Sequence, residues 1–277
     1  MAHQPDFDDL LTAPNPHLTT RTMGISHSTA RWLAPLSWAI DFAAQLYGML
    51  SDPNMKQIHD ANISFFSPQP YFIGAFFFPQ QIAQLAWLWR LQNARDPASK
   101  TTAAMVDYVP YYALGNLCIA AWMIFWNNDN LELSNVFVTI NSVAQLYFIS
   151  SRLPPMDPRD RDSVLTHVVS KTFAGIGVLD LLHNTSAAYF VGAQPSTLVK
   201  ALTGVGFGGL AVASDWIFGG CLVYDLVALC VGQHIYGNGS WSKLLAVYAA
   251  GTATIVGLKN TMRPPYQPGS ATGYRAL

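Results

Sequence analysis

The stretch YVPYYALGNLCIAAWMIFW, residues 108–126, contains no Asp, Glu, Lys or Arg. A helix needs about 20 predominantly apolar residues to cross the hydrocarbon core of a bilayer. The stretch therefore predicts a membrane-spanning helix, which the polar turn NNDN at 127–130 would close. A soluble protein could bury one such helix, so the prediction depends on whether similar stretches recur along the chain.

Six further stretches are similarly long and apolar. They cover residues 32–50, 70–90, 132–151, 171–191, 205–232 and 241–259. Short polar loops separate them, and long apolar runs in such a series are typical of membrane helices. We predict an all-α fold, a polytopic integral membrane helical bundle of about seven transmembrane helices. The transmembrane domain is expected at 32–260, between disordered tails at 1–31 and 261–277.

The composition of the 277-residue chain agrees with a membrane protein and excludes two other classes. Charged residues are 11% of the chain and hydrophobic residues 51%, whereas an average soluble domain has about 25% charged residues. A disordered chain would have low hydrophobicity and high charge. The net charge of −1 gives no basic surplus for a nucleic-acid partner. The three cysteines lie in apolar stretches without metal-ligand spacing, so we predict no metal and no cofactor.

The positions of Lys and Arg predict a cytosolic N-terminus, because cytosolic loops of membrane proteins are enriched in both. With seven spans, the cytosolic side would hold Arg21, Arg31, Arg90, Arg95, Lys100, Arg152, Arg159, Arg161 and Lys243. The opposite side would hold Lys56, Lys200, Lys259, Arg263 and Arg275, together with the C-terminus. The sequon Asn62-Ile63-Ser64 on that side predicts a glycoprotein, and we expect the endoplasmic reticulum membrane as its location.

Acidic residues inside the predicted spans are the candidate functional residues. Asp41, Asp180 and Asp215 lie near the centres of the first, fifth and sixth spans, and Asp225 lies nearer the end of the sixth. A charged residue at the centre of a membrane helix costs about 2.5–3.5 kcal/mol, and such residues are usually functional. No Lys or Arg is expected at the same depth, since Lys171 begins the fifth span. Carboxyl groups without a cation nearby are candidate proton donors.

Helical spacing adds a possible partner for one of these acids. His183 follows Asp180 by three residues and lies on the same helix face, so either side chain could orient or protonate the other. Many aromatic residues in the spans, among them Phe77 and Trp122, could line a cavity and stabilise a cation with their ring faces. Alternatively, the polar residues only join neighbouring helices by hydrogen bonds, and the aromatic residues only pack.

Residues 62–150 loosely resemble the TspO-like tryptophan-rich sensory family. The similarity lies in the stretch ISFFSPQPYFIGAFFFPQQIAQLAWLW at 63–89, in the LGN motif at 114–116 with the tryptophans after it, and in the tight turn that follows. This resemblance implies a binder or transporter of hydrophobic ligands that carries out no catalysis. The chain departs from the family pattern in its seven predicted spans, where the family has five, and in its buried aspartates.

The whole chain is similar to the small integral-membrane terpene cyclases of fungal meroterpenoid biosynthesis, of the ascofuranone and macrophorin type. The similarity lies in length, number of spans, short polar tails and intramembrane acids, without a motif that assigns catalytic positions. It implies a secondary-metabolism enzyme, an isomerase that protonates an epoxide or terminal alkene of a farnesylated, lipid-like substrate. The candidate acids are Asp41, Asp180 and Asp215, with Asp225 in reserve and His183 as partner or terminal base. A proton-coupled transporter is a third interpretation.

Overall fold

A computed structural model describes residues 24–262, which are helical and contain no strand. The helices are α1 (His27–Leu50), α2 (Met55–Ala61), α3 (Pro70–Asn93), α4 (Lys100–Asn127), α5 (Leu131–Tyr147), α6 (Arg161–Tyr189), α7 (Thr197–Ala213), α8 (Trp216–Ile235) and α9 (Gly239–Met262). The end of α5 widens into one π-helical segment, η2 (Phe148–Arg152).

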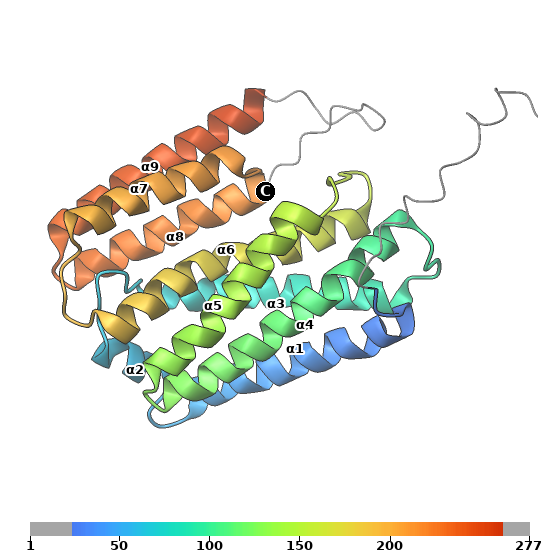
Figure 1. Cartoon of the computed structure of the whole chain (residues 1–277), viewed down its shortest axis with the longest axis horizontal. Coiled ribbons are helices and arrows are strands. Elements are labelled where there is room, and N and C mark those ends of the chain that lie inside the picture. Colours follow the sequence, from blue (N-terminus) through green and yellow to red (C-terminus); the bar gives the residue numbers. More distant parts are fainter. Residues whose placement is uncertain (1–23, 263–277) are drawn as a thin grey trace, which may run out of the picture.

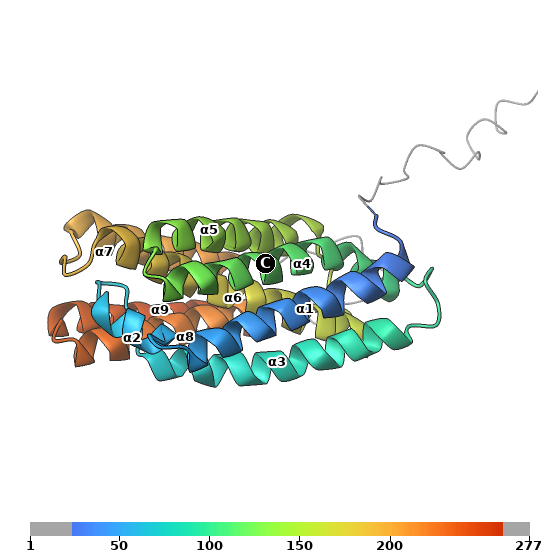
Figure 2. The ribbon, with the colours of Figure 1, turned by 90° about the horizontal axis from the view of Figure 1, so that it is seen from below.

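The long helices lie side by side along one axis of the molecule, and successive long helices run in opposite directions (Figure 1). Helix α6 occupies the centre, where it packs against α3, α4, α5 and α8. Helix α1 packs mainly on α4, and α8 packs mainly on α9. The short helix α2 lies at one end of the bundle, between the end of α1 and the start of α3 (Figure 2). We call this end the α2 end, and the end at which α1 begins the α1 end.

Polar side chains at the helix starts explain where the helices begin. Ser26, Asn54, Ser99 and Ser196 each accept a hydrogen bond from a backbone N–H of the first turn of the helix that follows. Such a cap satisfies one of the N–H groups that lack a partner inside the helix. Gln69, Asn130, Asp160 and Asp215 cap their helices in the same way.

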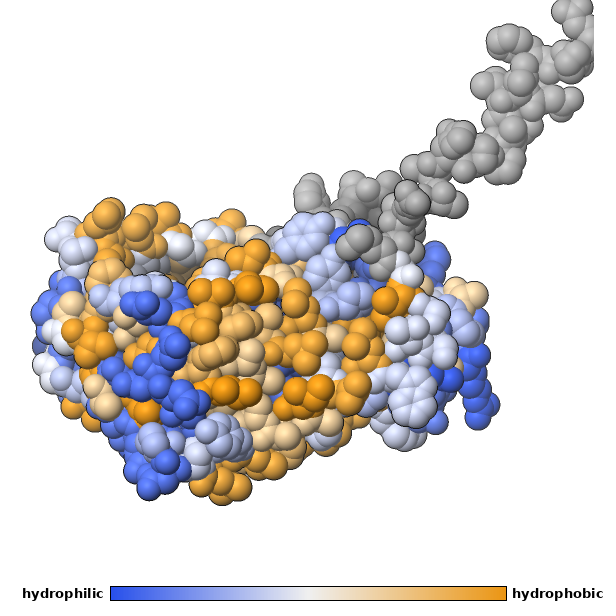
Figure 3. All heavy atoms as spheres, turned by 60° about the horizontal axis from the view of Figure 1, so that its bottom comes forward, coloured by the Kyte–Doolittle hydropathy of each residue, from blue (hydrophilic) through white to orange (hydrophobic). Residues whose placement is uncertain are grey.

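Five helical segments are long and apolar enough to cross a membrane: Lys100–Asn127, Leu131–Arg152, Arg161–Tyr189, Trp216–Ile235 and Gly239–Met262. Many large apolar side chains of the other helices also point outward, including Trp32, Leu36 and Ile82. Figure 3 shows a hydrophobic surface across the middle of one face, with hydrophilic residues toward both ends. Soluble monomers rarely expose apolar patches of this kind. The helices are therefore compatible with an integral membrane protein.

The predicted span 205–232 is not one helix, which corrects the sequence analysis. Helix α7 ends at Ala213, and α8 begins at Trp216. The Asp215 carboxylate accepts hydrogen bonds from the backbone N–H groups of Ile217 and Phe218, which favours a helix start at this point. Because α7 adds a pass through the bundle, α9 ends on the side of the molecule where α1 begins (Figure 1). Lys200 and Lys243 were predicted on opposite sides of the membrane, but in the structure both lie at the α2 end.

The predicted tails also have different limits. Helix α1 begins at His27, five residues before the predicted domain boundary, and α9 continues to Met262. The remainder of the tails predicted at 1–31 and 261–277 lies outside the described residues 24–262.

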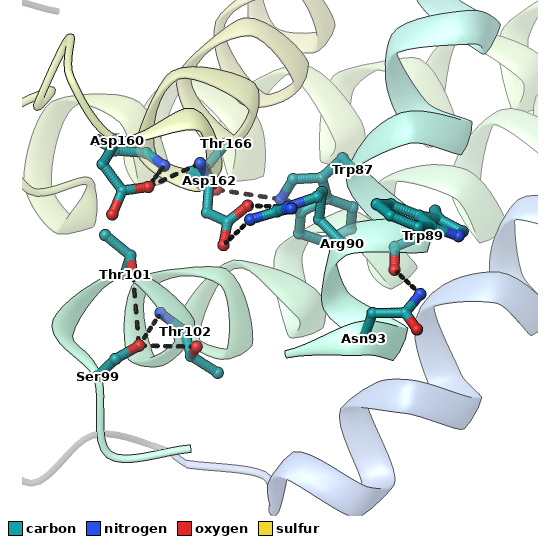
Figure 4. A network of polar contacts seen from close by, with 11 residues as sticks. Trp87, Trp89, Arg90, Asn93, Ser99, Thr101, Thr102, Asp160, Asp162 and Thr166 are labelled. Atoms are coloured by element: carbon teal, nitrogen blue, oxygen red, sulfur yellow. Dashed lines mark hydrogen bonds and ion pairs between the residues drawn. The ribbon is translucent and has the colours of Figure 1, made fainter. Parts of the chain in front are cut away.

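The α1 end is joined by ion pairs. Arg90 of α3 binds both carboxylate oxygens of Asp162 at the start of α6, as Figure 4 shows. Close by, the Trp87 indole donates a hydrogen bond of 3.1 Å to the hydroxyl of Thr166. Arg152 makes a 3.0 Å ion pair with Asp107 of α4. These contacts hold the helices together at one end, and the candidate site lies toward the other.

Candidate functional site

A cavity of about 390 Å³ lies near the α2 end, among α1, α2, α3, α4 and α6. This volume is within the range of small-molecule sites, which is about 300–1,000 Å³. Tyr71 and Phe78 of α3 line it and are 71% and 60% exposed, so the cavity opens beside α3. Its walls are largely aromatic and apolar, with these polar or charged exceptions: Gln45, Asn54, Lys56, His59, Asp180, His183 and Asn184.

Asp180 contributes an unpaired carboxyl group to the wall of this cavity. The Asn184 side chain donates a hydrogen bond to the backbone carbonyl of Asp180, one turn earlier in α6. No residue in the range 24–262 donates a hydrogen bond to the carboxyl group itself. A carboxyl group without a partner in an apolar cavity is the arrangement expected for a general acid.

Asp41 lies in a second cavity of about 70 Å³ that shares several walls with the first, Asp180 among them. The Gln45 amide donates a 3.2 Å hydrogen bond to the Asp41 carboxyl group. Gln80, Gln81 and Gln84 of α3 line the same space. The structure therefore brings two of the predicted acids to adjoining cavities, and one of them already has an amide partner.

His183 lines the first cavity and is connected to two residues that sequence reasoning missed, of which His59 also lines the cavity and Tyr236 does not. Nε2 of His183 lies 3.1 Å from Nδ1 of His59 in α2, and Nε2 of His59 lies 2.9 Å from the hydroxyl of Tyr236, just after α8. The Tyr236 hydroxyl also donates to the carbonyl of Pro68 at 3.3 Å. His59 lies in a polar segment between two predicted spans, and no pattern there distinguishes it from a loop residue. Its part in the site follows from the fold alone.

Asp225 is fully buried and does not line either cavity. Neither of its carboxyl oxygens has a hydrogen-bond partner. It lies within electrostatic range of Asp180. It is therefore a neighbour of the site and has no access to a ligand in the cavity.

Asp215 differs from the prediction, which placed it unpaired at the centre of a helix. Its Oδ2 atom lies 2.6 Å from Nζ of Lys171, whose side chain is 3% exposed. Lys171 was predicted at the start of a span, but α6 begins ten residues earlier, so the lysine is inside the bundle. Asp215 thus forms an ion pair and caps α8, at a position away from the cavities.

The aromatic residues divide between the site and the rest of the bundle. Phe77, Phe78 and Trp122 line the larger cavity, and Phe76 and Phe173 line the smaller one. The sequence analysis did not single out Trp126, whose ring centre lies 5.5 Å from that of His183. Other aromatic residues of the spans lie outside both cavities: Phe125 stacks on Phe137, and Phe218 packs in the core.

The sequon predicted to carry a glycan is occupied by structural contacts. The Asn62 amide donates to the carbonyl of Ile58 and to the Asp129 carboxylate, each at 3.0 Å. The hydroxyl of Ser64 is buried and bonded to that of Ser186 at 2.6 Å. The folded chain therefore does not present this sequence as a free loop.

The comparisons with known proteins identify no family for this chain. No family model matches it, and no curated protein or solved structure is significantly similar to it. In the described part of the chain, no group of three or more His, Cys, Asp or Glu side chains could hold a metal ion. The case for a function therefore depends on the cavity and the groups that line it.

Proposed function

We propose that the protein is an integral membrane terpene cyclase that protonates a prenylated, lipid-like substrate in the cavity beside α6. The observation that carries the proposal is the Asp180 carboxyl group, which lies unpaired in the wall of an aromatic cavity of about 390 Å³. This is the chemistry that the sequence analysis expects of a meroterpenoid cyclase. The activity is an isomerisation, since the proton given at the start is balanced by one lost at the end. We assign it to secondary metabolism.

In this reaction Asp180 donates its proton to an epoxide oxygen, whose C–O bond then opens to leave a hydroxyl group, or to a terminal alkene carbon, whose π electrons form the new C–H bond. The cation that forms is attacked by successive double bonds of the prenyl chain, and each attack forms a carbon–carbon bond. The ring faces of Trp122 and Phe77 stabilise the positive charge as it moves. A final C–H bond breaks, its electrons form a double bond, and His183 in the cavity wall accepts the proton.

The membrane arrangement that we propose extends the five apolar segments. Helices α1 and α3 contain 24 residues each, enough to span about 30 Å at 1.5 Å per residue, and we place them across the bilayer as well. The seven spans of this proposal are α1, α3, α4, α5 with η2, α6, α8 and α9, where α8 replaces the predicted span 205–232. The 17-residue helix α7 adds a shorter pass.

The charge distribution sets the orientation in this proposal. Among residues 24–262, the cationic residues near the α1 end outnumber those near the α2 end by eight to three. At the α1 end they are Arg31, Arg90, Arg95, Lys100, Arg152, Arg159, Arg161 and Lys259, and at the α2 end Lys56, Lys200 and Lys243. The α1 end is therefore cytosolic, with the cavity in the lumenal half of an endoplasmic reticulum membrane. A prenylated substrate in the bilayer would enter beside α3, where Tyr71 and Phe78 are exposed.

The test is product formation by membranes that contain the full chain. Microsomes with the wild-type protein are incubated with farnesylated and epoxyfarnesylated phenols, and products of unchanged mass are separated by chromatography. We expect cyclic isomers from the wild type and none from Asp180→Asn. The matched control is Asp107→Asn, an acid in an ion pair at the α1 end, which should retain activity. Equal product from wild type and Asp180→Asn would overturn the role of Asp180.

The opening of the cavity beside the lipid-facing helix α3 supports a second function. A TspO-like binder of hydrophobic ligands would use the same cavity without chemistry. It predicts saturable binding of the farnesylated phenol to the purified protein and no isomeric product. Binding should be lost in Phe78→Arg. Substrate turnover excludes this alternative, and binding without turnover excludes the cyclase.

A further inference from the structure

A continuous chain of hydrogen-bonding groups leads away from the cavity at the α2 end. It runs from His183 in α6 to His59 in α2, and from there to Tyr236 after α8, with contacts of 3.1 Å and 2.9 Å. The two histidines line the cavity, and His59 is buried. Tyr236 is half-buried beside the exposed residues His234 and Ile235, so the chain ends near the molecular surface.

His59 uses both ring nitrogens in this chain, one toward each neighbour. A neutral imidazole donates a hydrogen bond from one nitrogen and accepts at the other, so it can take a proton on one side and release it on the other. Burial lowers the pKa of His59 to about 4, and burial raises the pKa of Tyr236 to about 12. Both groups are therefore neutral near pH 7, as a relay requires.

A structural role alone would not require this arrangement. One hydrogen bond from His59 would be enough to attach α2 to α6, and the second connects it to a phenol near the surface. Asp60 and Lys56 form an exposed ion pair on α2, and their charges act on His59 in opposite directions. The charge of Asp60 also acts on Tyr236, so charged groups in contact with water lie at the outer end of the chain.

We propose that Tyr236, His59 and His183 form a proton relay between the surface at the α2 end and the cavity that contains Asp180. This inference rests on the proposed cyclase function and adds two residues to it. The proton from the final C–H bond is accepted by His183 and leaves through His59 and Tyr236 to water. A proton returns by the same chain and restores Asp180, which lines the same cavity one helical turn from His183. One proton enters and one leaves in each cycle.

The relay predicts that Tyr236, which does not line the cavity, affects repeated turnover and not the first one. In Tyr236→Phe, Asp180 begins protonated, so the first turnover in a rapid-quench experiment should keep the wild-type rate. The steady-state rates of Tyr236→Phe and His59→Gln should fall by about 10²-fold, the lower end of typical proton-transfer effects. Added imidazole should restore part of the His59→Gln rate. The matched control is His234→Gln, an exposed histidine two residues from Tyr236, which should keep both rates.

The outcomes separate the relay from the cyclase proposal. An equal loss of first and later turnovers in Tyr236→Phe, or an unchanged steady-state rate in Tyr236→Phe and His59→Gln, overturns the relay. Absence of product from the wild type overturns the cyclase instead. The relay is then tested by Trp126 fluorescence after a rapid drop in pH, because the His183 ring lies 5.5 Å from that indole. Tyr236→Phe should slow the response at least 10-fold, and an unchanged rate contradicts the relay; Trp126→Phe identifies the signal.

Discussion

Asp180 and Asp215 are both acidic residues in apolar stretches, and the fold gives them opposite surroundings. Asp180 lies within a continuous helix, faces a cavity, and receives no hydrogen bond on its carboxyl group from the described residues. Asp215 lies between two helices, caps α8 with one oxygen and binds Lys171 with the other. The chemistry available to a buried carboxylate therefore depends on the partners that the fold supplies.

The difference has a simple energetic basis. A carboxylate that binds a lysine and two backbone N–H groups is stabilised in its charged form, and it stabilises the helix start. A carboxyl group in an aromatic cavity lacks that compensation and keeps its proton available for a substrate. One aspartate thus belongs to the structure and the other to the site, and substitutions at the two positions should affect different measurements.

The largest expected effect is on activity, at Asp180. Asp180→Asn keeps the size of the side chain and removes the proton, so turnover should fall by about 10²–10⁴-fold. The thermal unfolding midpoint of the purified protein should not fall, because the carboxyl group has no partner to lose. Asp180→Glu should recover part of the activity. A large drop in the midpoint of Asp180→Asn would place this residue with Asp215 among the structural acids.

The next largest effect is on stability, at Asp215. In Asp215→Asn the amide oxygen can still cap α8, but Lys171 becomes a buried cation without its counter-charge. Removal of one partner from a buried ion pair costs about 3–5 kcal/mol, so the thermal midpoint in detergent should fall clearly. The double variant Lys171→Met with Asp215→Asn should recover most of that loss. Activity per folded molecule should remain near the wild-type value, and a selective loss of activity would contradict the comparison.

The comparison also shows what the sequence could establish. Hydropathy correctly predicted helical segments near 108–126 and 132–151, because lipid-facing and buried helix faces are both apolar. Hydropathy also placed Asp41, Asp180 and His183 inside helices, and helical spacing placed Asp180 and His183 on one face. In the structure these residues line adjoining cavities. The resemblance to terpene cyclases stays a prediction.

Three features were beyond hydropathy. It could not detect the break at Ser214 and Asp215, since the apolar residues on both sides give one continuous run, although an Asp at that point is also a typical helix cap. It placed Lys171 at a helix end because the polar first turns of α6 do not resemble a membrane span. The approach of His59 to His183 joins residues 124 positions apart, and a single sequence carries no signal for it.

A third prediction extends the comparison to pH. Burial lowers the pKa of His59 to about 4, whereas an unfolded histidine titrates near 6.5. The unfolded chain therefore binds the extra proton first, and the folded state loses stability as the pH falls from 6.5 toward 4, by at most about 3 kcal/mol. The thermal midpoint of the wild type should fall over this window. His59→Gln, which does not titrate, should reduce the fall. An equal fall in both would assign the effect to other groups.

The smallest expected effect concerns the wall beside Asp180. The Trp122 indole donates a 2.6 Å hydrogen bond to the Asn184 amide oxygen, and Asn184 donates to the Asp180 backbone carbonyl. Trp122→Phe keeps an aromatic wall and removes that donor, at a cost of about 1 kcal/mol. Because the substitution leaves the acid in place, KM should rise about fivefold while kcat stays near the wild-type value. Trp216→Phe, at a position 54% exposed and outside both cavities, is the control. A loss confined to kcat would show that the indole of Trp122 stabilises the reacting cation better than a phenyl ring does, so that its part in the site goes beyond the position of Asn184.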